Sequence, residues 1–307
     1  MSGTGWVDIQ VNGYAGVDFN SDRLTVDQLL AVCDRLERDG ISKILPTIIT
    51  APLDSMLNRI SNLRRWIEGY PIIAARFAGI HVEGPFINPQ TGFVGAHPPI
   101  AVLPANLEVA QRIVDAGMGY VRLVTLAPEA DPGFSVTKWL ASNNIVVAGG
   151  HSDATIRQLR EAIDAGLKLY THLGNGCPTL LPRHDNIIQR VLSVADEIAI
   201  SFIADGHHIP PFVLTNYLRL VPEKNIVIVS DAISAAGLGP GDYELFGQTV
   251  HVDHLGAAWS ADRKHFAGSA STLMDMRKVL QSIGITDAQI RQWFQENPAR
   301  LLSICDP

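Results

Sequence analysis

Four apolar stretches of this sequence each lead into a side chain that can bind a metal ion or carry a proton. The four side chains are Glu83, His151, His172 and Asp231. Two imidazoles and one carboxylate form the donor set of many catalytic zinc sites, which keep a further position open for water. A second carboxylate near that water can serve as general base and then as general acid. One isolated glutamate would be interpreted as a solvated turn residue. Recurrence at four strand ends instead favours a metal site with a proton-transfer partner.

The stretches that carry these side chains belong to a regular alternation of strands and helices. Strands are expected over residues 6–11, 42–49, 77–82, 120–126, 145–148, 168–171, 198–203 and 226–229, and helices over 25–39, 55–66, 105–116, 135–143, 155–165 and 211–220. The strands are mostly continuous apolar runs, as buried parallel strands are. The sequence therefore predicts an α/β fold, a (β/α)₈ TIM-type barrel. The four side chains would lie at its carboxyl-end mouth, where such barrels carry their active sites.

The pattern changes after the eighth predicted strand. Residues 243–265 alternate loosely between polar and apolar and predict a small hairpin insertion. A helix is predicted to open at residues 268–272 and to run to 283, and the last predicted helix covers 286–296 and ends before Asn297-Pro298. Because the sequence contains no internal repeat, low-complexity segment or linker, we expect residues 1–307 to form a single domain.

Composition limits the classes of function. The chain has 307 residues, 47% of them hydrophobic, which is ample for a large core. A formal net charge of -7 and a pI near 5.8 argue against nucleic acid or a membrane surface as partner. Three cysteines without a C-x-x-C pair are expected to be reduced thiols of a cytoplasmic protein. We expect no signal peptide, and no apolar run approaches the roughly 20 residues of a membrane span.

Several motifs follow one another over most of the chain. They are Asp8–Gly13, Gly79–Pro85, Gly95–His97, Gly150–Asp153, Thr171–Asn175, Ala204–His208, Ser230–Asp231 and Ala267–Ser269. In type and order they resemble the N-acetylglucosamine-6-phosphate deacetylases, a family of the amidohydrolase superfamily. The resemblance implies hydrolysis of the N-acetyl group of N-acetylglucosamine 6-phosphate to glucosamine 6-phosphate and acetate. It also implies attack by a hydroxide held on the metal, with Asp231 as general base and then general acid.

The resemblance implies a role for particular residues. The metal ligands would be Glu83, His151 and His172, and the catalytic residues Asp231 and His97. The substrate-binding residues would be His97, Asn175, Gly176, Arg183, His208, Phe266, Ala267 and Gly268. The remaining histidines considered, His184, His251, His254 and His265, lie outside any strand-end pattern and are expected to take no part.

Two amides in the first predicted strand bear on the number of metal ions. Gln10 and Asn12 stand where many amidohydrolases have a His-x-His pair that holds a second ion. Amide side chains are weaker ligands than imidazoles. We therefore expect one divalent ion, with Zn²⁺ favoured and Fe²⁺, Co²⁺ or Mn²⁺ as alternatives.

Three features depart from the family. The chain starts close to the first strand and stops soon after residue 297, so the family's small β-sandwich domain is expected to be absent. The apolar surface that such a domain would cover predicts a homodimer. Segments 90–95 and 173–178 differ from the family's usual loops, and the first lies in a long loop, 85–104, of functional length.

These departures leave the substrate open. An unphosphorylated N-acetyl amino sugar or an N-acyl amino acid would use the same metal centre, and only Arg183 and His208 argue for a phosphate. A non-catalytic sugar-binding barrel is the alternative from another class. Asp231 argues against it, because a protein that only binds sugar needs no carboxylate beside the metal.

Overall fold

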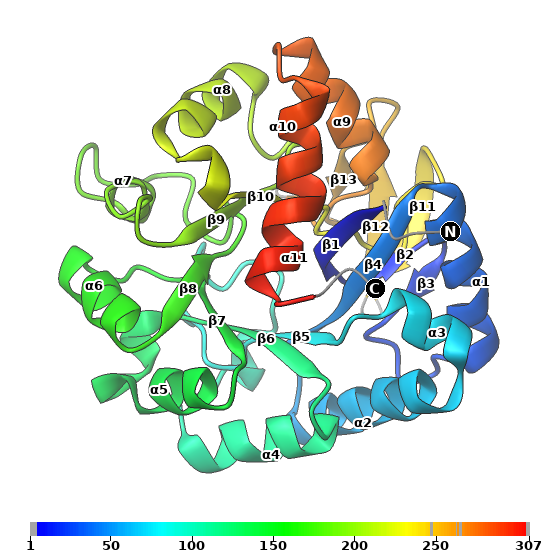
Figure 1. Cartoon of the computed structure of the whole chain (residues 1–307), viewed down its shortest axis with the longest axis horizontal. Coiled ribbons are helices and arrows are strands. Elements are labelled where there is room, and N and C mark those ends of the chain that lie inside the picture. Colours follow the sequence, from blue (N-terminus) through cyan, green and yellow to red (C-terminus); the bar gives the residue numbers. More distant parts are fainter. Residues whose placement is uncertain (1–4, 246–247, 262, 264–265, 305–307) are drawn as a thin grey trace.

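A closed barrel of eight parallel strands forms the centre of the molecule (Figure 1). The computed structural model describes residues 5–245, 248–261, 263 and 266–304. The strands, in their order around the barrel, are β1 (Trp6–Val11), β4 (Ile41–Ile49), β5 (Ile80–Glu83), β6 (Val121–Leu126), β7 (Val146–Gly149), β8 (Leu167–Tyr170), β9 (Ala199–Phe202) and β10 (Ile226–Ile228). The predicted (β/α)₈ barrel is therefore confirmed.

The two ends of the sheet meet at Ala232, just beyond β10. Val11 and Ala232 form a parallel bridge, and the N–H groups of Asn12 and Gly13 both donate to the Ala232 carbonyl, at 2.7 and 3.0 Å. Closure in this way leaves no exposed strand edge between β1 and β10. It also brings the carboxyl ends of the first and last strands side by side.

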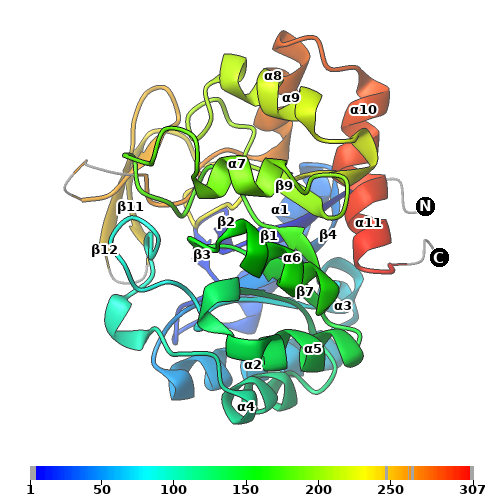
Figure 2. The ribbon, with the colours of Figure 1, turned by 90° about the vertical axis from the view of Figure 1, so that its left-hand side faces the viewer.

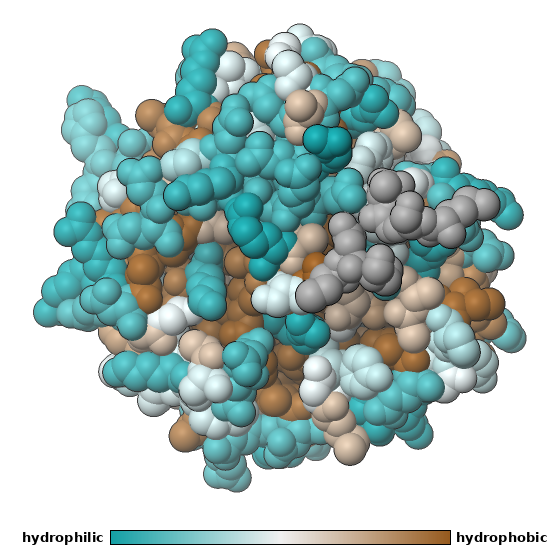
Figure 3. Space-filling view, viewed as in Figure 1, coloured by the Kyte–Doolittle hydropathy of each residue, from teal (hydrophilic) through white to brown (hydrophobic). Residues whose placement is uncertain are grey.

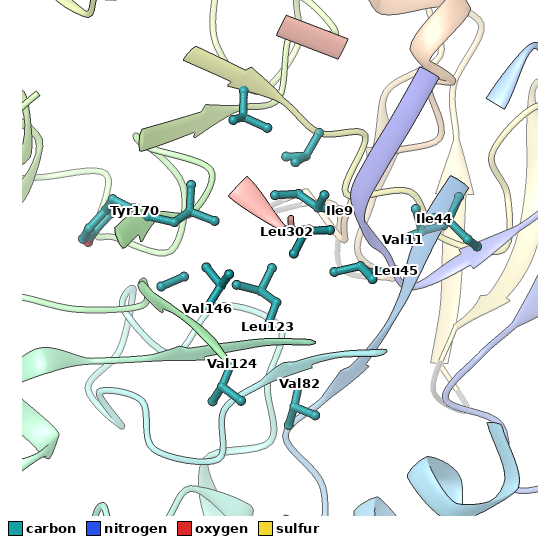
Figure 4. Packing of buried hydrophobic residues seen from close by; sticks show 14 of the residues in the cluster. Ile9, Val11, Ile44, Leu45, Val82, Leu123, Val124, Val146, Tyr170 and Leu302 are labelled. Carbon is teal, nitrogen blue, oxygen red and sulfur yellow. The ribbon is translucent and has the colours of Figure 1, made fainter. Parts of the chain in front are cut away.

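Apolar side chains fill the amino-terminal part of the barrel interior, and above them the buried side chain of His81 lies within hydrogen-bond distance of the buried side chains of Thr47 and Thr125, at 3.2 and 2.8 Å. Ile9, Leu45, Val82 and Leu123 are almost fully buried; Figure 4 shows Ile9, Leu45 and Leu123 near Leu302 inside the barrel, and Val82 on the other face of its strand. Full burial of one such side chain contributes about 1.5–3 kcal/mol. This is why continuous apolar runs in the sequence, rather than alternating ones, marked the strands.

Helices surround the barrel. They are α1 (Val26–Arg38), α2 (Leu53–Gly69), α3 (Pro71–Arg76), α4 (Leu107–Gly117), α5 (Ser135–Ser142), α6 (Ile156–Asp164), α7 (Ile187–Leu192), α8 (Pro211–Leu220), α9 (Leu273–Ser282), α10 (Asp287–Arg291) and α11 (Asn297–Leu301), with 3₁₀ turns η1 (Pro99–Ala101), η2 (Pro128–Ala130), η3 (Pro132–Phe134) and η4 (Glu223–Asn225). Capping boxes from Thr25, Thr155, Thr272 and Thr286 begin α1, α6, α9 and α10. Such reciprocal hydrogen bonds satisfy the free N–H groups of a helix start. Two short helices, α3 and α7, were not predicted.

The region predicted as a hairpin is a small antiparallel sheet. It contains β11 (Gly241–Leu245), β12 (Gln248–Val252) and β13 (Ala258–Trp259), so a third strand was missed. Residues 246–247, 262 and 264–265 of the predicted hairpin lie outside the described residues. Figure 2 shows β11 and β12 on the side of the molecule opposite the two termini. A second two-strand sheet, β2 (Gly13–Tyr14) with β3 (Val17–Asp18), follows β1.

The C-terminal helix differs from the prediction. We expected it to end before Asn297-Pro298, but it continues through a π-helical turn, η5 (Gln292–Glu296), into α11. Pro298 is tolerated because it lies at the start of α11, where its missing N–H costs little. The Asn297 amide donates to the carbonyl of Ile226 at 2.6 Å, and Leu302 is buried against the barrel core (Figure 4). The helix therefore closes the amino-terminal end of the barrel.

The outer surface fits a barrel wrapped in helices. On the face that Figure 1 presents, hydrophilic side chains cover most of the surface, and hydrophobic ones appear in patches between them (Figure 3). Among the residues described, none of the helices has the length and apolar character needed to cross a bilayer.

Candidate metal and acid–base site

Glu83 is the centre of the candidate site. It is the last residue of β5 and is 3% exposed. Its Oε1 lies 3.2 Å from Nε2 of His151 and 2.9 Å from Nε2 of His172, and its Oε2 lies 3.8 Å from Nε2 of His97. The structure therefore brings the three predicted ligands together, and it adds His97 to the same group.

The electrostatics of this cluster favour a cation. Burial alone would raise the pKa of Glu83, but the neighbouring imidazoles of His151 and His172 hold it well below its usual range. Burial alone would lower the pKa of His172, but Glu83 raises it. A buried carboxylate against two imidazoles is stable only when positive charge, from a proton or a metal ion, lies between them.

The second ring nitrogen of His151 tests whether this side chain suits a metal. Its Nδ1 lies 2.8 Å from the carbonyl oxygen of Phe93, which can only accept, so Nδ1 carries a proton. Nε2, which faces Glu83, is then the nitrogen that can offer a lone pair. This is the arrangement in which histidines usually bind metals. His172 also turns Nε2 toward Glu83, and its buried Nδ1 has no partner among the described residues.

His97 has the opposite arrangement. Its Nδ1 accepts a hydrogen bond from the backbone N–H of Thr50 at 3.3 Å and lies 2.9 Å from the Thr50 hydroxyl. Burial and the neighbouring His151 lower the pKa of His97 to about 3, so the ring is neutral. With Nδ1 as acceptor, Nε2 bears the proton.

This tautomer decides between two uses of His97. One ligand atom each from Glu83, His97 and His151 lies within 4.8 Å of the others, so proximity alone would allow a metal site made of these three. A protonated Nε2, however, has no lone pair to offer. His97 is suited to donate a hydrogen bond, and the cluster as a whole can hold a divalent ion.

Asp231 lies on the same rim, beyond β10, and its carboxylate is connected to Glu83. Oδ1 of Asp231 accepts from the Asn12 amide at 2.7 Å and from the Gln10 amide at 3.2 Å. The same Gln10 nitrogen lies 3.0 Å from Oε1 of Glu83. Burial, reinforced by the charge of Glu83 and opposed by His172, raises the pKa of Asp231. A carboxyl with a raised pKa takes up a proton more readily than a solvated carboxyl does, which suits a group that must accept a proton and then give it up.

The Gln10 amide is fully engaged. Its nitrogen bridges the two carboxylates, and its oxygen accepts from the Thr171 hydroxyl at 2.6 Å. The oxygen is therefore not free to bind a second ion. Asn12 differs, because its buried Oδ1 has no donor among the described residues and leaves one acceptor beside Asp231.

Three of these side chains stand on unusual backbone. The φ angles of His151, His172 and Asp231 are 50°, 30° and 48°, in the left-handed region that residues other than glycine rarely adopt. Each such residue costs about 1–3 kcal/mol and persists only where the surrounding structure holds it. The common cause is the sharp turn of the chain directly after β7, β8 and β10, which directs each side chain into the mouth.

Two loops close over the ring of His151. A Cβ on Gly176 would lie 2.8 Å from its Nδ1, and a Cβ on Gly95 would lie 3.1 Å from its Cε1. Both glycines also have positive φ, 62° and 58°. Any larger residue at either position would displace the imidazole, so the loops that follow β5 and β8 both depend on glycine here.

The predicted substrate-binding residues are less tightly held. Asn175 donates from its amide to the His172 carbonyl at 3.2 Å. Arg183 is exposed and makes no hydrogen bond or ion pair with any residue that the structure describes. The structure therefore does not bring Arg183 into contact with the Glu83 cluster.

His208 is held more firmly than Arg183. Its Nδ1 lies 2.7 Å from Oδ2 of Asp205, and its ring packs on Phe266 with centroids 5.0 Å apart. Ala267 and Gly268 follow Phe266 along the chain, and Ala267 is 7% exposed. His251 lies on β12, where its Nδ1 is 2.6 Å from Oδ1 of Asp242. His265 lies outside the described residues.

Sequence reasoning missed three residues that hold the site. Thr50 orients His97, and Asp205 orients His208. Glu129, just beyond β6, accepts from Asn88 at 3.0 Å and from the Ser152 hydroxyl at 2.6 Å, joining the loops on either side of His151. Each of the three closely follows a predicted strand, as Glu83, His151, His172 and Asp231 do. Their position after a strand was therefore the signal that could have identified them.

Comparison with known proteins gives a consistent result. No family model matches the sequence. The N-acetylgalactosamine-6-phosphate deacetylase of Escherichia coli O157:H7 is 33% identical over 305 residues, which are 97% of this chain and 77% of that protein. The N-acetylglucosamine-6-phosphate deacetylase of Bos taurus is 32% identical over 308 residues, 98% of this chain and 74% of that protein.

Solved structures give the same picture. An N-acetyl-D-glucosamine-6-phosphate deacetylase mutant from Mycobacterium smegmatis, in complex with N-acetyl-D-glucosamine-6-phosphate, superposes with a TM-score of 0.87 at 27% identity, covering 98% of this chain and 78% of that one. The corresponding enzyme from Thermotoga maritima gives a TM-score of 0.85 at 25% identity, covering 98% and 78%. A dihydroorotase, at 12% identity and a TM-score of 0.52, shares the fold alone.

Proposed function

The chain belongs to the N-acetylglucosamine-6-phosphate deacetylase family, and on that premise we propose that it hydrolyses N-acetylglucosamine 6-phosphate to glucosamine 6-phosphate and acetate. The observation that carries the proposal is the convergence of His97, His151 and His172 on Glu83, with Asp231 joined to it through Gln10. A protein that only binds sugar has no use for two carboxylates that are joined through Gln10, one with a lowered pKa and the other with a raised pKa.

The proposed ligands of the ion are Glu83, His151 and His172. The donor set of two imidazoles and one carboxylate suits Zn²⁺, with Fe²⁺, Co²⁺ and Mn²⁺ as alternatives. A divalent ion bound here would polarise the acyl carbonyl and lower the pKa of a bound water to about 7. The engaged amide of Gln10 supports one ion rather than two.

The protein's own residues would carry the proton transfers. Asp231 accepts the proton of the attacking water and later gives it to the amide nitrogen, because an amine anion is too poor a leaving group to depart unprotonated. His97 keeps its Nε2 proton and donates a hydrogen bond from it to the oxygen of the acyl carbonyl, where negative charge develops. Thr50 keeps that proton on Nε2 by occupying Nδ1. The C–N bond breaks, and acetate and the free amine leave.

Arg183 and His208 would bind the sugar 6-phosphate. The planar guanidinium group matches phosphate oxygens in pairs, and Arg183 has no described partner to compete. Asp205 fixes the ring of His208 through Nδ1 and leaves Nε2 for the ligand. Phe266, Ala267, Gly268, Asn175 and Gly176 would line the rest of the sugar pocket.

A homodimer and a cytoplasmic location complete the proposal. Exposed apolar side chains near the loops of the barrel mouth, Leu180, Phe212 and Leu255, are 90%, 72% and 68% exposed and support an interface. Apolar surface of this kind tends to be covered by a partner, and a second copy of the chain is the commonest one.

The test is an assay of acetate release by the purified protein supplied with Zn²⁺. N-acetylglucosamine 6-phosphate, N-acetylgalactosamine 6-phosphate and unphosphorylated N-acetylglucosamine would be compared. We expect the first to be the best substrate. The second sugar is included because one relative is named for it. Equal kcat/KM on phosphorylated and unphosphorylated sugars would favour the alternative substrates, and no release from any would favour a binding protein.

A further inference from the structure

A cavity of about 720 Å³ opens beside His97. Its lining includes Thr50, His97 and Ala267, and also Ile49, Ala51 and Val250. Pockets that bind small molecules commonly measure about 300–1,000 Å³. Among the described residues that line it, none belongs to the loops after β8 and β9. The cavity is therefore separate from the residues proposed to bind phosphate.

The cavity lies on the opposite side of the barrel from those residues. Ile49, Thr50 and Ala51 end β4, the second strand in the barrel order, whereas Arg183 follows β8, the sixth. Strands that are four positions apart in a ring of eight lie diametrically opposite each other. His97 and the Glu83 cluster lie between the two sides.

The substrate has matching geometry. In a 2-acylamino-hexose 6-phosphate, the amide is on C2 and the phosphate is carried by C5 through C6. C2 and C5 occupy opposite corners of the six-membered ring, so the acyl chain points away from the phosphate. With the phosphate on the β8 and β9 side and the acyl carbonyl at His97, the acyl chain extends toward the β4 side.

We propose that this cavity is an acyl-chain subsite, through which the enzyme also hydrolyses hexosamine 6-phosphates whose N-acyl groups are uncharged and longer than acetyl. The inference rests on the proposed function. The acetyl methyl group would fill only a small part of this space, and Ile49, Ala51 and Val250 line it together with polar residues such as Asn20, Ser21 and Thr249, so a longer uncharged chain meets a lining of mixed character. Water adds to the acyl carbon, the C–N bond breaks, and the products are a carboxylate and the amine, so the chemistry does not change.

The charges of the cavity favour an uncharged chain. Arg59 is paired with Asp22 at 2.7 Å and is not available to an anion. Arg23 stands at the wall together with the acidic Glu244. With Asp18, Asp22 and Glu244 in the lining against Arg23 and Arg59, a negatively charged acyl group would meet no net attraction.

The test compares N-acetyl, N-butanoyl and N-hexanoyl glucosamine 6-phosphate by release of the free amine. We expect kcat/KM for the butanoyl compound to lie within roughly tenfold of that for the acetyl compound. Thr249→Phe, at an exposed cavity-lining position on β12, narrows the space. It is expected to lower kcat/KM for the hexanoyl compound by at least about tenfold and for the acetyl compound by less than about twofold.

Two controls make the result decisive. Thr91→Phe places the same ring at an exposed position on the rim that does not line the cavity, and it should not change the ranking. Ser21→Phe narrows the cavity from a different segment of the chain. It provides a second test of the inference if Thr249→Phe fails to fold. Hydrolysis of the acetyl compound alone would overturn the inference, as would an equal loss on all three compounds in Thr249→Phe and Ser21→Phe. Failure of the wild type on every compound would overturn the proposed function together with it.

Discussion

The two sides of the barrel mouth are built in different ways. On the side of β5 and β7, Glu83 and His151 are 3% and 6% exposed, and their polar atoms are within 3.2 Å of each other. On the side of the loop after β8, Arg183 is exposed and contacts no described polar group. The first side is fixed by its own contacts, whereas Arg183 on the second side has no polar contact with a described residue, so a ligand bound there would have to order it. Chemistry that needs fixed distances belongs to the first side, and recognition of a flexible phosphate suits the second.

The difference follows from the distance of each residue from the sheet. Glu83 is itself in β5, in register with Ile49 of β4 and Thr125 of β6. The sheet therefore fixes its Cα within the ladder of backbone hydrogen bonds. Arg183 lies eleven residues after His172, in a loop. Its long side chain must lose rotamer freedom on binding, at a cost of up to about 2 kcal/mol.

Removal of the metal ion should have the largest effect. Because the Glu83 cluster needs a cation between its carboxylate and imidazoles, we expect a chelator to abolish measurable activity. Added Zn²⁺ should restore it. Elemental analysis of the active protein should give about one ion per chain, since Gln10 is engaged with Thr171.

A stoichiometry near two that falls on changing Gln10 to Ala would contradict the one-ion proposal. Full activity after complete removal of the metal would contradict the proposed chemistry altogether. The chelated protein should keep its circular dichroism spectrum at 25 °C, because the barrel core is independent of the site.

The Asp231→Asn variant should have the next largest effect. We expect kcat to fall by about 10²–10⁴-fold, the usual contribution of a general acid–base group. The amide can still fill the place beside Asn12, so the metal content should be unchanged. Asp242→Asn, on exposed β11, is the matched control and should have no effect on kcat. Wild-type turnover in Asp231→Asn would refute the assigned role.

These first two predictions concern residues that the sequence itself singled out. Glu83, His151, His172 and Asp231 were recognisable because each ends or closely follows a run of buried apolar residues. In a barrel, every such end lies on one rim, so shared position along strands becomes shared position in space. The strands themselves were found to within about three residues at each end, a typical error for such boundaries.

Other parts could not be found in this way. The tautomer of His97 depends on Thr50, which is 47 residues away along the chain, and no local sequence pattern indicates that contact. The continuation of the last helix through Pro298 depends on the Asn297 amide reaching Ile226. Both are decided by tertiary contacts that compete with local preferences.

Arg183→Ala tests the other side of the mouth. A charge-assisted contact is worth roughly 1.5–3 kcal/mol, so kcat/KM for the phosphorylated sugar should fall by about 10- to 100-fold. Activity on the unphosphorylated sugar should stay within about twofold. Arg157→Ala, an exposed arginine on α6, is the control and should behave as the wild type. An equal loss on both sugars in Arg183→Ala would mean that this side does more than bind phosphate.

Thr50→Val should have the smallest effect, and it tests how far the fixed side depends on a single hydroxyl. The variant keeps the backbone N–H that holds Nδ1 of His97 and removes the hydroxyl at 2.9 Å. One neutral hydrogen bond contributes about 0.5–1.5 kcal/mol, so kcat should fall by roughly two- to tenfold. KM for the phosphorylated sugar should change little, because Thr50 lies far around the barrel from Arg183. Thr50→Ser restores the hydroxyl and should restore kcat, a rescue that a purely structural role would not require.

If valine matches the wild type, the backbone N–H alone orients His97. If KM rises while kcat is unchanged, the hydroxyl acts on substrate binding and the separation between the two sides of the mouth is weaker than the geometry indicates.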